Sequence, residues 1–292
     1  MKTVIFDGDT HAIVVVPTAN LDGSLFSRFV ESIRRYTNPV PTIVAVESSG
    51  SEFRFASSMN AGIKEAMKLS PKYVVLSNDD ITFTKNWLPS LVSSFDCVNH
   101  LGCAVPIITV PNGSKIDGVI YAKHWSEVLL LKVIYPFIPN NVKQGIFSRV
   151  SDFGITIGKR VTTELENVIP SSRRGLVVMS QPISVFPACI LSSLNMFDEA
   201  FLNGEEDFDL SIRLYSMGLK AAVQLNSIVM HESSVTGGRG WTRYTLHYKA
   251  YLNLIHLLDK NKFSQYYRFY NSCEKLTVIL RGNEQVIETT ER

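Results

Sequence analysis

The feature that most constrains the fold is a regular alternation, over the first hundred residues, of short apolar runs with segments of helical periodicity. The apolar runs are Ile13–Val16, Thr42–Val46 and Tyr73–Leu76. The segments between and after them repeat apolar residues every three or four positions, over 25–36, 59–67 and 87–95. Apolar strands that alternate with amphipathic helices are typical of a parallel sheet that is buried on both faces. The sequence therefore predicts an α/β fold with a mostly parallel central sheet flanked by helices.

The loops that follow these strands are the first places to look for a binding site. Right-handed crossovers bring such loops to a single edge of a parallel sheet. Ligands of open α/β sheets bind at that carboxyl edge. We therefore expect residues 17–20, 47–51 and 77–80 to lie near any site.

The second half of the chain is less regular. Strands are expected at 176–179, 183–191 and 221–230, and a helix over 206–217, with Gly218 where that helix would end. Residues 111–175 mix Gly, Pro and Asn with an apolar run. We expect one domain over residues 1–243 with an irregular insertion at about 111–175, and a helical tail over 244–292 packed on the same domain.

Charge and composition exclude several classes of protein. The chain has 29 Lys and Arg against 27 Asp and Glu, and 45% of its residues are hydrophobic. It is too apolar to be disordered and too nearly neutral to coat nucleic acid. Asp7 and Asp9 fall where a signal peptide needs an apolar core, and no apolar run has the length of a membrane span. With four scattered cysteines and no C-x-x-C pair, we expect a cytoplasmic protein.

Two adjacent acids, Asp79 and Asp80, directly follow the third apolar run. Such a pair is costly at the end of a strand unless a cation or hydrogen-bond donors meet it. Hard divalent cations bind carboxylate oxygens and often complete their coordination with substrate phosphates. A turn or a helix cap is the alternative interpretation.

A second group of acids opens the helix expected over 206–217 and includes Glu206, Asp207 and Asp209. One of them could act as a general base on a hydroxyl group. The alternative is ordinary compensation of the helix dipole.

A histidine and a glycine-rich loop follow the strand expected at 221–230. His231 could ligate a metal or have a structural role. The segment 236–243 contains three glycines, Arg239 and Arg243. It could approach and pair with a diphosphate, or be a surface loop.

Together these features resemble the inverting nucleotide-sugar glycosyltransferases of the GT-A fold, family 2, and in particular its rhamnosyltransferase-like members. The similar stretches are IVVVPTAN (13–20), TIVAVESSGS (42–51), SSMNAGIKEA (57–66), YVVLSNDDI (73–81), FDEAFLNGEEDFDLSIRLYSMG (197–218) and VMHESS (229–234). The stretch 197–218 is the most specific of them. The resemblance does not cover 111–175 or the tail.

The resemblance implies a role for each matching residue. Asp207 would be the catalytic base, Asp80 and His231 would bind the metal, and Glu206 and Asp209 would be further acids near the site. The residues expected to contact the donor nucleotide are Pro17, Thr18, Glu47, Asn60, Asp79 and Arg243. Glu47 stands where the family usually has an aspartate that contacts the base, so the resemblance leaves UDP-, GDP- and dTDP-sugars open.

The implied activity is sugar transfer, with inversion, from a nucleoside-diphosphate sugar to an acceptor hydroxyl. Asp207 would take the proton of that hydroxyl, assisted by Mn²⁺ or Mg²⁺. The acceptor could be a glycan, a lipid-linked sugar or a protein, and no nucleic acid is implied. The apolar stretch Trp125–Ile138 and the basic tail could contact the inner face of a membrane. A buried element for the first and a solvated helix with an apolar stripe for the second are the favoured interpretations.

Three other functions fit parts of the sequence. A catalytically inactive module could bind nucleotide sugars or glycans without turnover. A nucleotidyltransferase would also use paired acids, but the loop after the Ile13–Val16 run lacks the basic, glycine-rich character that it needs. The segment from Asp7 to Asp9 resembles the nucleophile motif of haloacid-dehalogenase-type phosphatases, but Thr10 stands where that motif usually has a glycine.

Overall fold

The structure is a computed structural model. The residues that it describes are 1–50, 53–109, 115–117, 119–122, 155–157, 176–178, 182–204, 206–232, 253, 256, 264–265, 267–268 and 276–288. The stretch Trp125–Ile138, the loop with Arg239 and Arg243, and most of the expected C-terminal helix lie outside these ranges.

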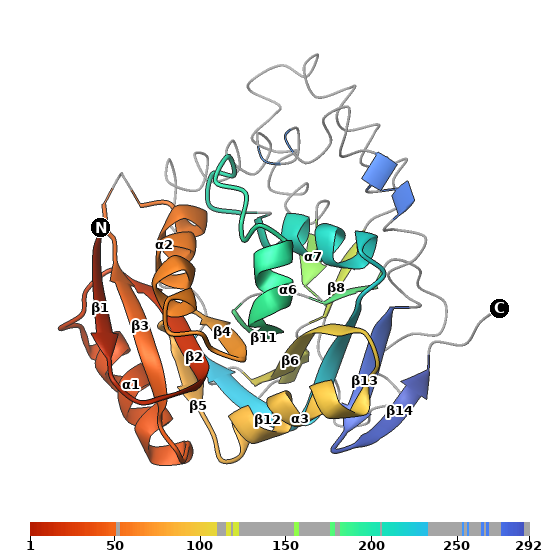
Figure 1. Ribbon diagram of the computed structural model, residues 1–292, viewed down its shortest axis with the longest axis horizontal. Coiled ribbons are helices and arrows are strands. Elements are labelled where there is room, and N and C mark those ends of the chain that lie inside the picture. The colour runs from red at the N-terminus through yellow and green to blue at the C-terminus, as the bar shows by residue number, and fades with distance from the viewer. Residues whose placement is uncertain are drawn as a thin grey trace.

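The described residues build one large sheet, one small sheet and the helices that cover the large sheet (Figure 1). The helices are α1 (Ser24–Tyr36), α2 (Phe55–Met67), α3 (Trp87–Cys97), α6 (Ala188–Ser193) and α7 (Glu206–Ser216). The large sheet contains β1 (Lys2–Phe6), β2 (Asp9–Thr18), β3 (Pro41–Glu47), β4 (Tyr73–Ser77), β5 (Ile81–Phe83), β6 (Leu101–Thr109), β7 (Lys115–Asp117), β11 (Ile183–Pro187), β12 (Lys220–His231), β13 (Thr277–Arg281) and β14 (Glu284–Glu288). The small sheet contains β8 (Val119–Ala122), β9 (Ile155–Ile157) and β10 (Leu176–Val178).

The large sheet has the order β1-β3-β2-β4-β11-β6-β12-β13-β14, with β5 paired to β12 and β7 paired to β6. Strand β2 is parallel to β3 and β4, and β12 is parallel to β6 and β13. Strand β11 lies between these two parallel groups and is antiparallel to both of its neighbours. The predicted α/β sheet with flanking helices is confirmed, with the added finding that an antiparallel strand joins its two halves.

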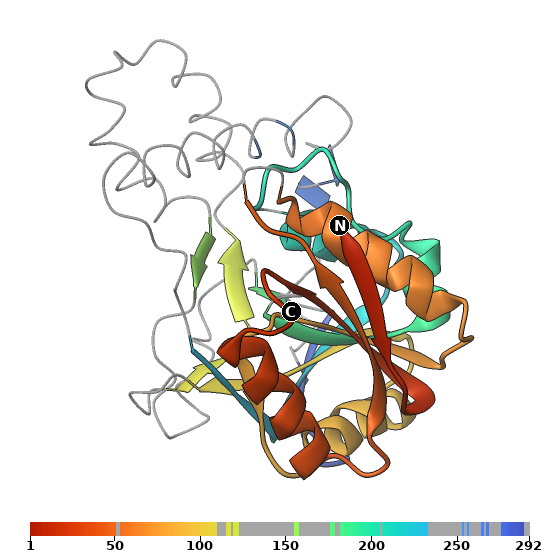
Figure 2. The same cartoon turned by 90° about the vertical axis from the view of Figure 1, so that its left-hand side faces the viewer.

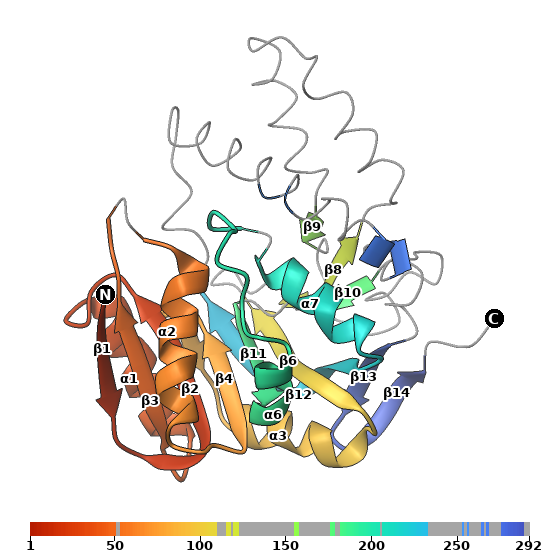
Figure 3. The same ribbon diagram turned by 45° about the horizontal axis from the view of Figure 1, so that its top comes forward.

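Alternating side chains of β2 explain why the sheet is covered on both faces. Ile13 and Val15 belong to the core that contains the buried residues of α2, α6 and α7. Val14 and Val16 belong to the core under α1 and α3. Because successive side chains of a strand point to opposite faces, one apolar run supplies both cores. Figure 2 shows α1 and α2 on opposite sides of the edge formed by β1 and β3, and Figure 3 shows α2, α6 and α7 together on one face.

Two expectations about strands need correction. The strand expected at 183–191 ends at Pro187, and the chain continues as α6. Strands β1 and β5 to β9 were not expected from the sequence, and the tail that was expected to be helical over 244–292 contains the strands β13 and β14. The strands predicted at 13–16, 42–46, 73–76, 176–179 and 221–230 are confirmed, as are the helices predicted over 25–36, 59–67, 87–95 and 206–217, within a few residues at each end.

Gly62 lets α2 pack directly on β2 and β3. A Cβ at this position would lie 2.5 Å from Val15 Cγ1 and 3.0 Å from Val46 Cγ2. Both valines are fully buried and cannot move away freely. We expect Gly62→Ala to lower the free energy of unfolding by about 1–3 kcal/mol, as overpacking does in other cores.

Urea denaturation of Gly62→Ala, Val15→Ala and the double variant measures this effect. Val15→Ala removes the atom that the new Cβ would meet. The double variant should therefore lose less free energy of unfolding than the two single variants lose together, by at least about 0.5 kcal/mol. Strict additivity would show that the contact between α2 and β2 is not the cause.

Within the described ranges, none of the helices combines the length and the apolar character that crossing a lipid bilayer requires.

Candidate active site

The carboxyl ends of β2, β3 and β4 meet at one edge of the sheet, as the positions of the loops predicted. Thr18 ends β2 and is buried, and its hydroxyl donates a hydrogen bond to Asp79 Oδ2 at 2.7 Å. Burial raises the pKa of Asp79, while the Thr18 hydrogen bond opposes that rise. Pro17 precedes Thr18 inside the strand and is also buried. Glu47 ends β3, and its Oε1 accepts the Leu21 N–H at 3.2 Å.

Asp80 and His231 are brought together although 151 positions separate them. Strand β5 begins directly after Asp80 and pairs with the end of β12, so that Ile81 lies opposite His231. The Glu232 N–H donates to the Asp80 carbonyl at 3.0 Å and closes the same ladder. His231 Nε2 then lies 3.1 Å from Asp80 Oδ2. The predicted association of these two residues therefore follows from strand pairing.

The second carboxylate oxygen of Asp80 makes this pair suitable for a cation. Asp80 Oδ1 is buried and accepts no hydrogen bond from the residues that the structure describes. A buried carboxylate oxygen without a partner is costly, and a bound cation relieves that cost. Among the described residues, no three His, Cys, Asp or Glu side chains gather into a metal site. The carboxylate oxygen fits Mn²⁺ or Mg²⁺ where substrate phosphates complete the coordination, and the imidazole nitrogen suits a transition metal such as Mn²⁺ better than Mg²⁺.

Asp207 lies in the first turn of α7, and its Oδ1 accepts the Phe208 N–H at 2.8 Å. Burial raises the pKa of the Asp207 carboxyl above its ordinary value. A raised pKa makes a carboxylate a stronger base, provided that it is ionised at the working pH. Among the described residues, Asp207 shares no hydrogen bond with Asp80 or His231.

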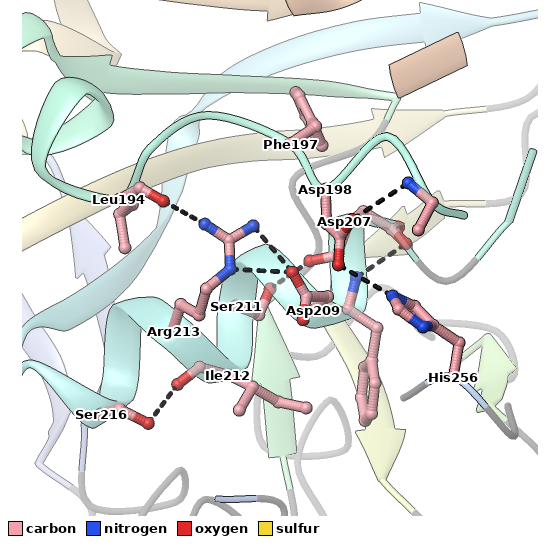
Figure 4. Close-up of polar contacts among 12 residues, drawn as sticks. Leu194, Phe197, Asp198, Asp207, Asp209, Ser211, Ile212, Arg213, Ser216 and His256 are labelled. Atoms are coloured by element: carbon pink, nitrogen blue, oxygen red, sulfur yellow. Dashed lines mark hydrogen bonds and ion pairs between the residues drawn. The ribbon is translucent and has the colours of Figure 1, made fainter. Parts of the chain in front are cut away.

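The two neighbouring acids of α7 have different surroundings. Glu206 is buried and accepts the Gly204 N–H. Asp209 is buried and forms an ion pair with Arg213, whose Nη2 lies 2.7 Å from Asp209 Oδ2 (Figure 4). Arg213 also donates to the Leu194 carbonyl. Asp209 therefore ties α7 to the end of α6.

Glu206 gives the fold a pH dependence of known sign. Burial, and then the charge of Asp207, raise the pKa of Glu206 to about 7. The folded state therefore keeps a proton that the unfolded state loses from about pH 4.5 upward. We expect the free energy of unfolding to fall by about 3 kcal/mol on this account as the pH rises to 7, and to change no further above it.

Urea denaturation at pH 5 and pH 8 tests this expectation. Glu206→Gln should remove the contribution of Glu206 to the difference in the free energy of unfolding between pH 5 and pH 8. The exposed Glu284→Gln should leave that difference as it is in the wild type. Equal pH dependence in wild type and Glu206→Gln would contradict the assignment.

Asn60 lies against the chain that leads to α7. The side chain is buried, and its Nδ2 donates to the Phe197 carbonyl at 2.9 Å and to Glu199 Oε1 at 2.8 Å. Its Oδ1 accepts the Phe197 N–H at 3.0 Å. These bonds give Asn60 a structural role, and its contact with the donor stays a prediction.

Three further residues contact the same part of the chain and were not found from the sequence. They are Asn203, Asn253 and His256. Asparagine and histidine occur throughout the chain, so no spacing or motif distinguishes these three from the others. Only the tertiary fold identifies them.

Comparison with solved structures identifies the fold. The chain superposes on a crystal structure of GalNAc-T7 with UDP, GalNAc and Mn²⁺, with a TM-score of 0.56, 16% sequence identity and coverage of 88% of this chain and 49% of that chain. A crystal structure of S. aureus TarS, residues 1–349, matches with a TM-score of 0.41 and 12% identity over 76% of this chain and 58% of that chain. The chain thus spans about half the length of these solved chains. No protein-family model and no curated protein sequence matches it.

The mixed α/β fold with its central sheet is therefore that of the GT-A glycosyltransferases. The likeness to GalNAc-T7 covers most of this chain. At this level of identity it establishes the architecture and leaves family membership, including family 2, open.

Proposed function

We propose that the protein is a metal-assisted glycosyltransferase that moves a sugar from a nucleoside-diphosphate sugar to an acceptor hydroxyl with inversion. The observation that carries the proposal is the Asp80–His231 pair, with its unpartnered buried oxygen, at the carboxyl edge of a GT-A sheet. The Thr18–Asp79 hydrogen bond beside it supports a donor-binding role for that edge.

Each residue has a defined task in this proposal. Asp80 and His231 would hold Mn²⁺ or Mg²⁺, which offsets the negative charge of a leaving diphosphate. The hydrogen bond between Thr18 and Asp79 fixes the orientation of both side chains beside the donor. Asp207 takes the proton of the acceptor hydroxyl as that oxygen attacks the anomeric carbon from the side opposite the diphosphate. The C–O bond to the diphosphate breaks as the new one forms, so no covalent enzyme intermediate is needed.

The phosphatase alternative receives no support from the placement of its acids. Asp9 begins β2, at the opposite end of that strand from Thr18, and Asp7 stands in the turn before it. Strand β1, which would carry the nucleophile, is at the edge of the sheet and pairs antiparallel with β3. The two groups of acids therefore lie at opposite ends of the sheet.

A thermal-shift screen of nucleoside diphosphates and nucleotide sugars, with Mn²⁺ and with chelator, tests the proposal. A ligand at about one hundred times its Kd should raise Tm by about 4 °C for a chain of this size. We expect a shift for one base, larger with Mn²⁺ than with chelator, and release of the nucleoside diphosphate when a sugar acceptor is added. Binding without release, even to water, would identify an inactive binding module. No shift with any nucleotide would contradict the proposal.

A further inference from the structure

The loop of residues 197–204, which leads from α6 to Glu206 and Asp207, buries Phe197 and Phe201 in the core, and its residues 197–199 border a pocket. A cavity of about 480 Å³ opens between this loop, α2 and α7, and charged side chains such as Lys64 and Arg213 line part of it. Void space supplies no packing contacts to the backbone that borders it. Phe197 and Phe201 anchor the loop by packing, and hydrogen bonds fix the backbone between and after them.

Asparagine side chains supply those hydrogen bonds at both ends of the loop. Asn60 holds the backbone of Phe197 from α2. Asn203 accepts the Phe55 N–H at 2.7 Å and donates to the Phe53 carbonyl at 3.1 Å. Asn253 holds the last part of the loop, because its Oδ1 accepts the Leu202 N–H at 2.7 Å and its Nδ2 donates to the Gly204 carbonyl at 2.8 Å.

A second contact from the same C-terminal segment holds the middle of the loop. His256 Nε2 lies 2.9 Å from Asp198 Oδ2 (Figure 4). The His256 ring meets the Phe201 ring edge-on, with centroids 4.9 Å apart. Asn253 and His256 both have helical backbone conformation. Residues three positions apart are neighbours on the surface of a helix, which agrees with the contact of both residues with the same loop.

We propose that Asn253 and His256 are positioning residues, through which the C-terminal segment fixes the loop that presents Asp207 to the acceptor. This inference rests on the proposed transferase function. The connection to Asp207 is short: Asn253 binds the Gly204 carbonyl, the Gly204 N–H donates to Glu206, and Asp207 is the next residue.

The backbone of Gly204 adds to the dependence on Asn253. Its φ of +150° is outside the range that other residues adopt easily, and a Cβ there would lie 3.4 Å from Asn253 Nδ2. Glycine has many alternative conformations, so an external contact is needed to keep one of them. Removal of the Asn253 side chain should therefore free the turn directly before α7.

Three variants test the proposal: Asn253→Ala, His256→Ala and His256→Gln. Gln224→Ala is the matched control, because Gln224 is also a buried amide that clamps a glycine turn, with Nε2 3.0 Å from the Gly282 carbonyl and Oε1 3.3 Å from the Gly282 N–H. That turn lies between β13 and β14, and Gln224 contacts α3, where its Nε2 also donates to Ser94 Oγ at 3.1 Å. The readouts are kcat, the donor Kd, and hydrogen–deuterium exchange of the Leu202 and Gly204 amides.

We expect Asn253→Ala to speed exchange at Leu202 and Gly204 and to lower kcat by about ten- to a hundredfold, with the donor Kd unchanged within about twofold. His256→Ala should show the same pattern, and His256→Gln, which keeps a donor for Asp198, should recover part of the loss. Gln224→Ala should speed exchange at Gly282 and leave kcat per folded molecule at the wild-type value.

The outcomes separate this proposal from the function on which it rests. A wild-type protein that binds no nucleotide sugar and transfers no sugar overturns the proposed function, and the positioning role with it, whatever the exchange data show. A wild-type protein that is active, with Asn253→Ala exchanging faster but turning over normally, overturns the positioning role alone. Unchanged exchange at Leu202 and Gly204 in Asn253→Ala also overturns it. Equal loss of kcat in Gln224→Ala would assign the effect to general stability.

Discussion

Asp207→Asn is expected to lower sugar transfer by about a hundredfold to ten-thousandfold while the protein still binds its donor. The amide keeps the size of the carboxyl but cannot take the proton of the attacking hydroxyl, and general-base catalysis contributes a factor of this order. Burial that raises the pKa of Asp207 also moves the acid limb of the rate profile above the range of an exposed aspartate. Steady-state rates and donor titrations measure both parts of the expectation.

Asp209→Asn is the matched control for this variant. It makes the same chemical change two residues further along α7, at a carboxylate that is paired with Arg213. We expect it to lower stability, because it leaves the half-buried Arg213 without its charge partner, and to keep kcat per folded molecule close to the wild-type value. Normal turnover by Asp207→Asn, or equal loss in the two variants, would remove Asp207 from the reaction.

Asp80→Asn is expected to abolish the dependence of donor binding on Mn²⁺ and to lower transfer at least a hundredfold. The substitution removes the negative charge and one of the two side chains suited to the cation. Changes to groups that only support metal ligands cost about ten- to a hundredfold in affinity, so loss of a ligand should cost more. Titration of Mn²⁺ against the nucleotide-induced rise in Tm measures the effect without any need for turnover.

Asp79→Asn is the control that distinguishes loss of metal binding from loss of other contacts with the donor. Asp79 is adjacent to Asp80 but accepts its hydrogen bond from Thr18. We expect Asp79→Asn to weaken donor binding and to leave the Mn²⁺ midpoint near that of the wild type. The assignment of Asp80 fails if Asp80→Asn responds to Mn²⁺ at the wild-type concentration, or if full activity survives thorough removal of divalent metal.

The parts of the fold that could be predicted are those in which one residue pattern decides the structure. The run Ile13–Val16 is apolar on both faces, which only a doubly covered strand explains, and the periodicity of 25–36 fits only a helix. Strand β5 is three residues long and has no pattern of its own, because its pairing with β12 defines it. At Pro187 the apolar run continues into α6, and a short apolar run does not distinguish a buried strand from a buried helix.

Some residues of the candidate site could likewise be predicted from the sequence, and others could not. Asp79, Asp80 and His231 could be placed because the ends of strands have a fixed location in an α/β sheet, and the contacts of Thr18 and His231 agree with that placement. Asn253 and His256 could not, because their partners are backbone groups and one carboxylate in a distant loop. No sequence pattern indicates such contacts, because they form only when the C-terminal segment and the loop have both folded.

The order of strands in the large sheet has a consequence for synthesis on the ribosome. Strand β11, at residues 183–187, separates β4 from β6, and β12 covers the other side of β6. A nascent chain that has emerged only as far as residue 182 therefore exposes the edges of two apolar strands whose permanent neighbours do not yet exist. Unpaired edges of this kind invite aggregation. Completion of the half that contains β2, β3 and β4 must therefore wait for the translation of β11, and premature termination before residue 183 should yield insoluble product.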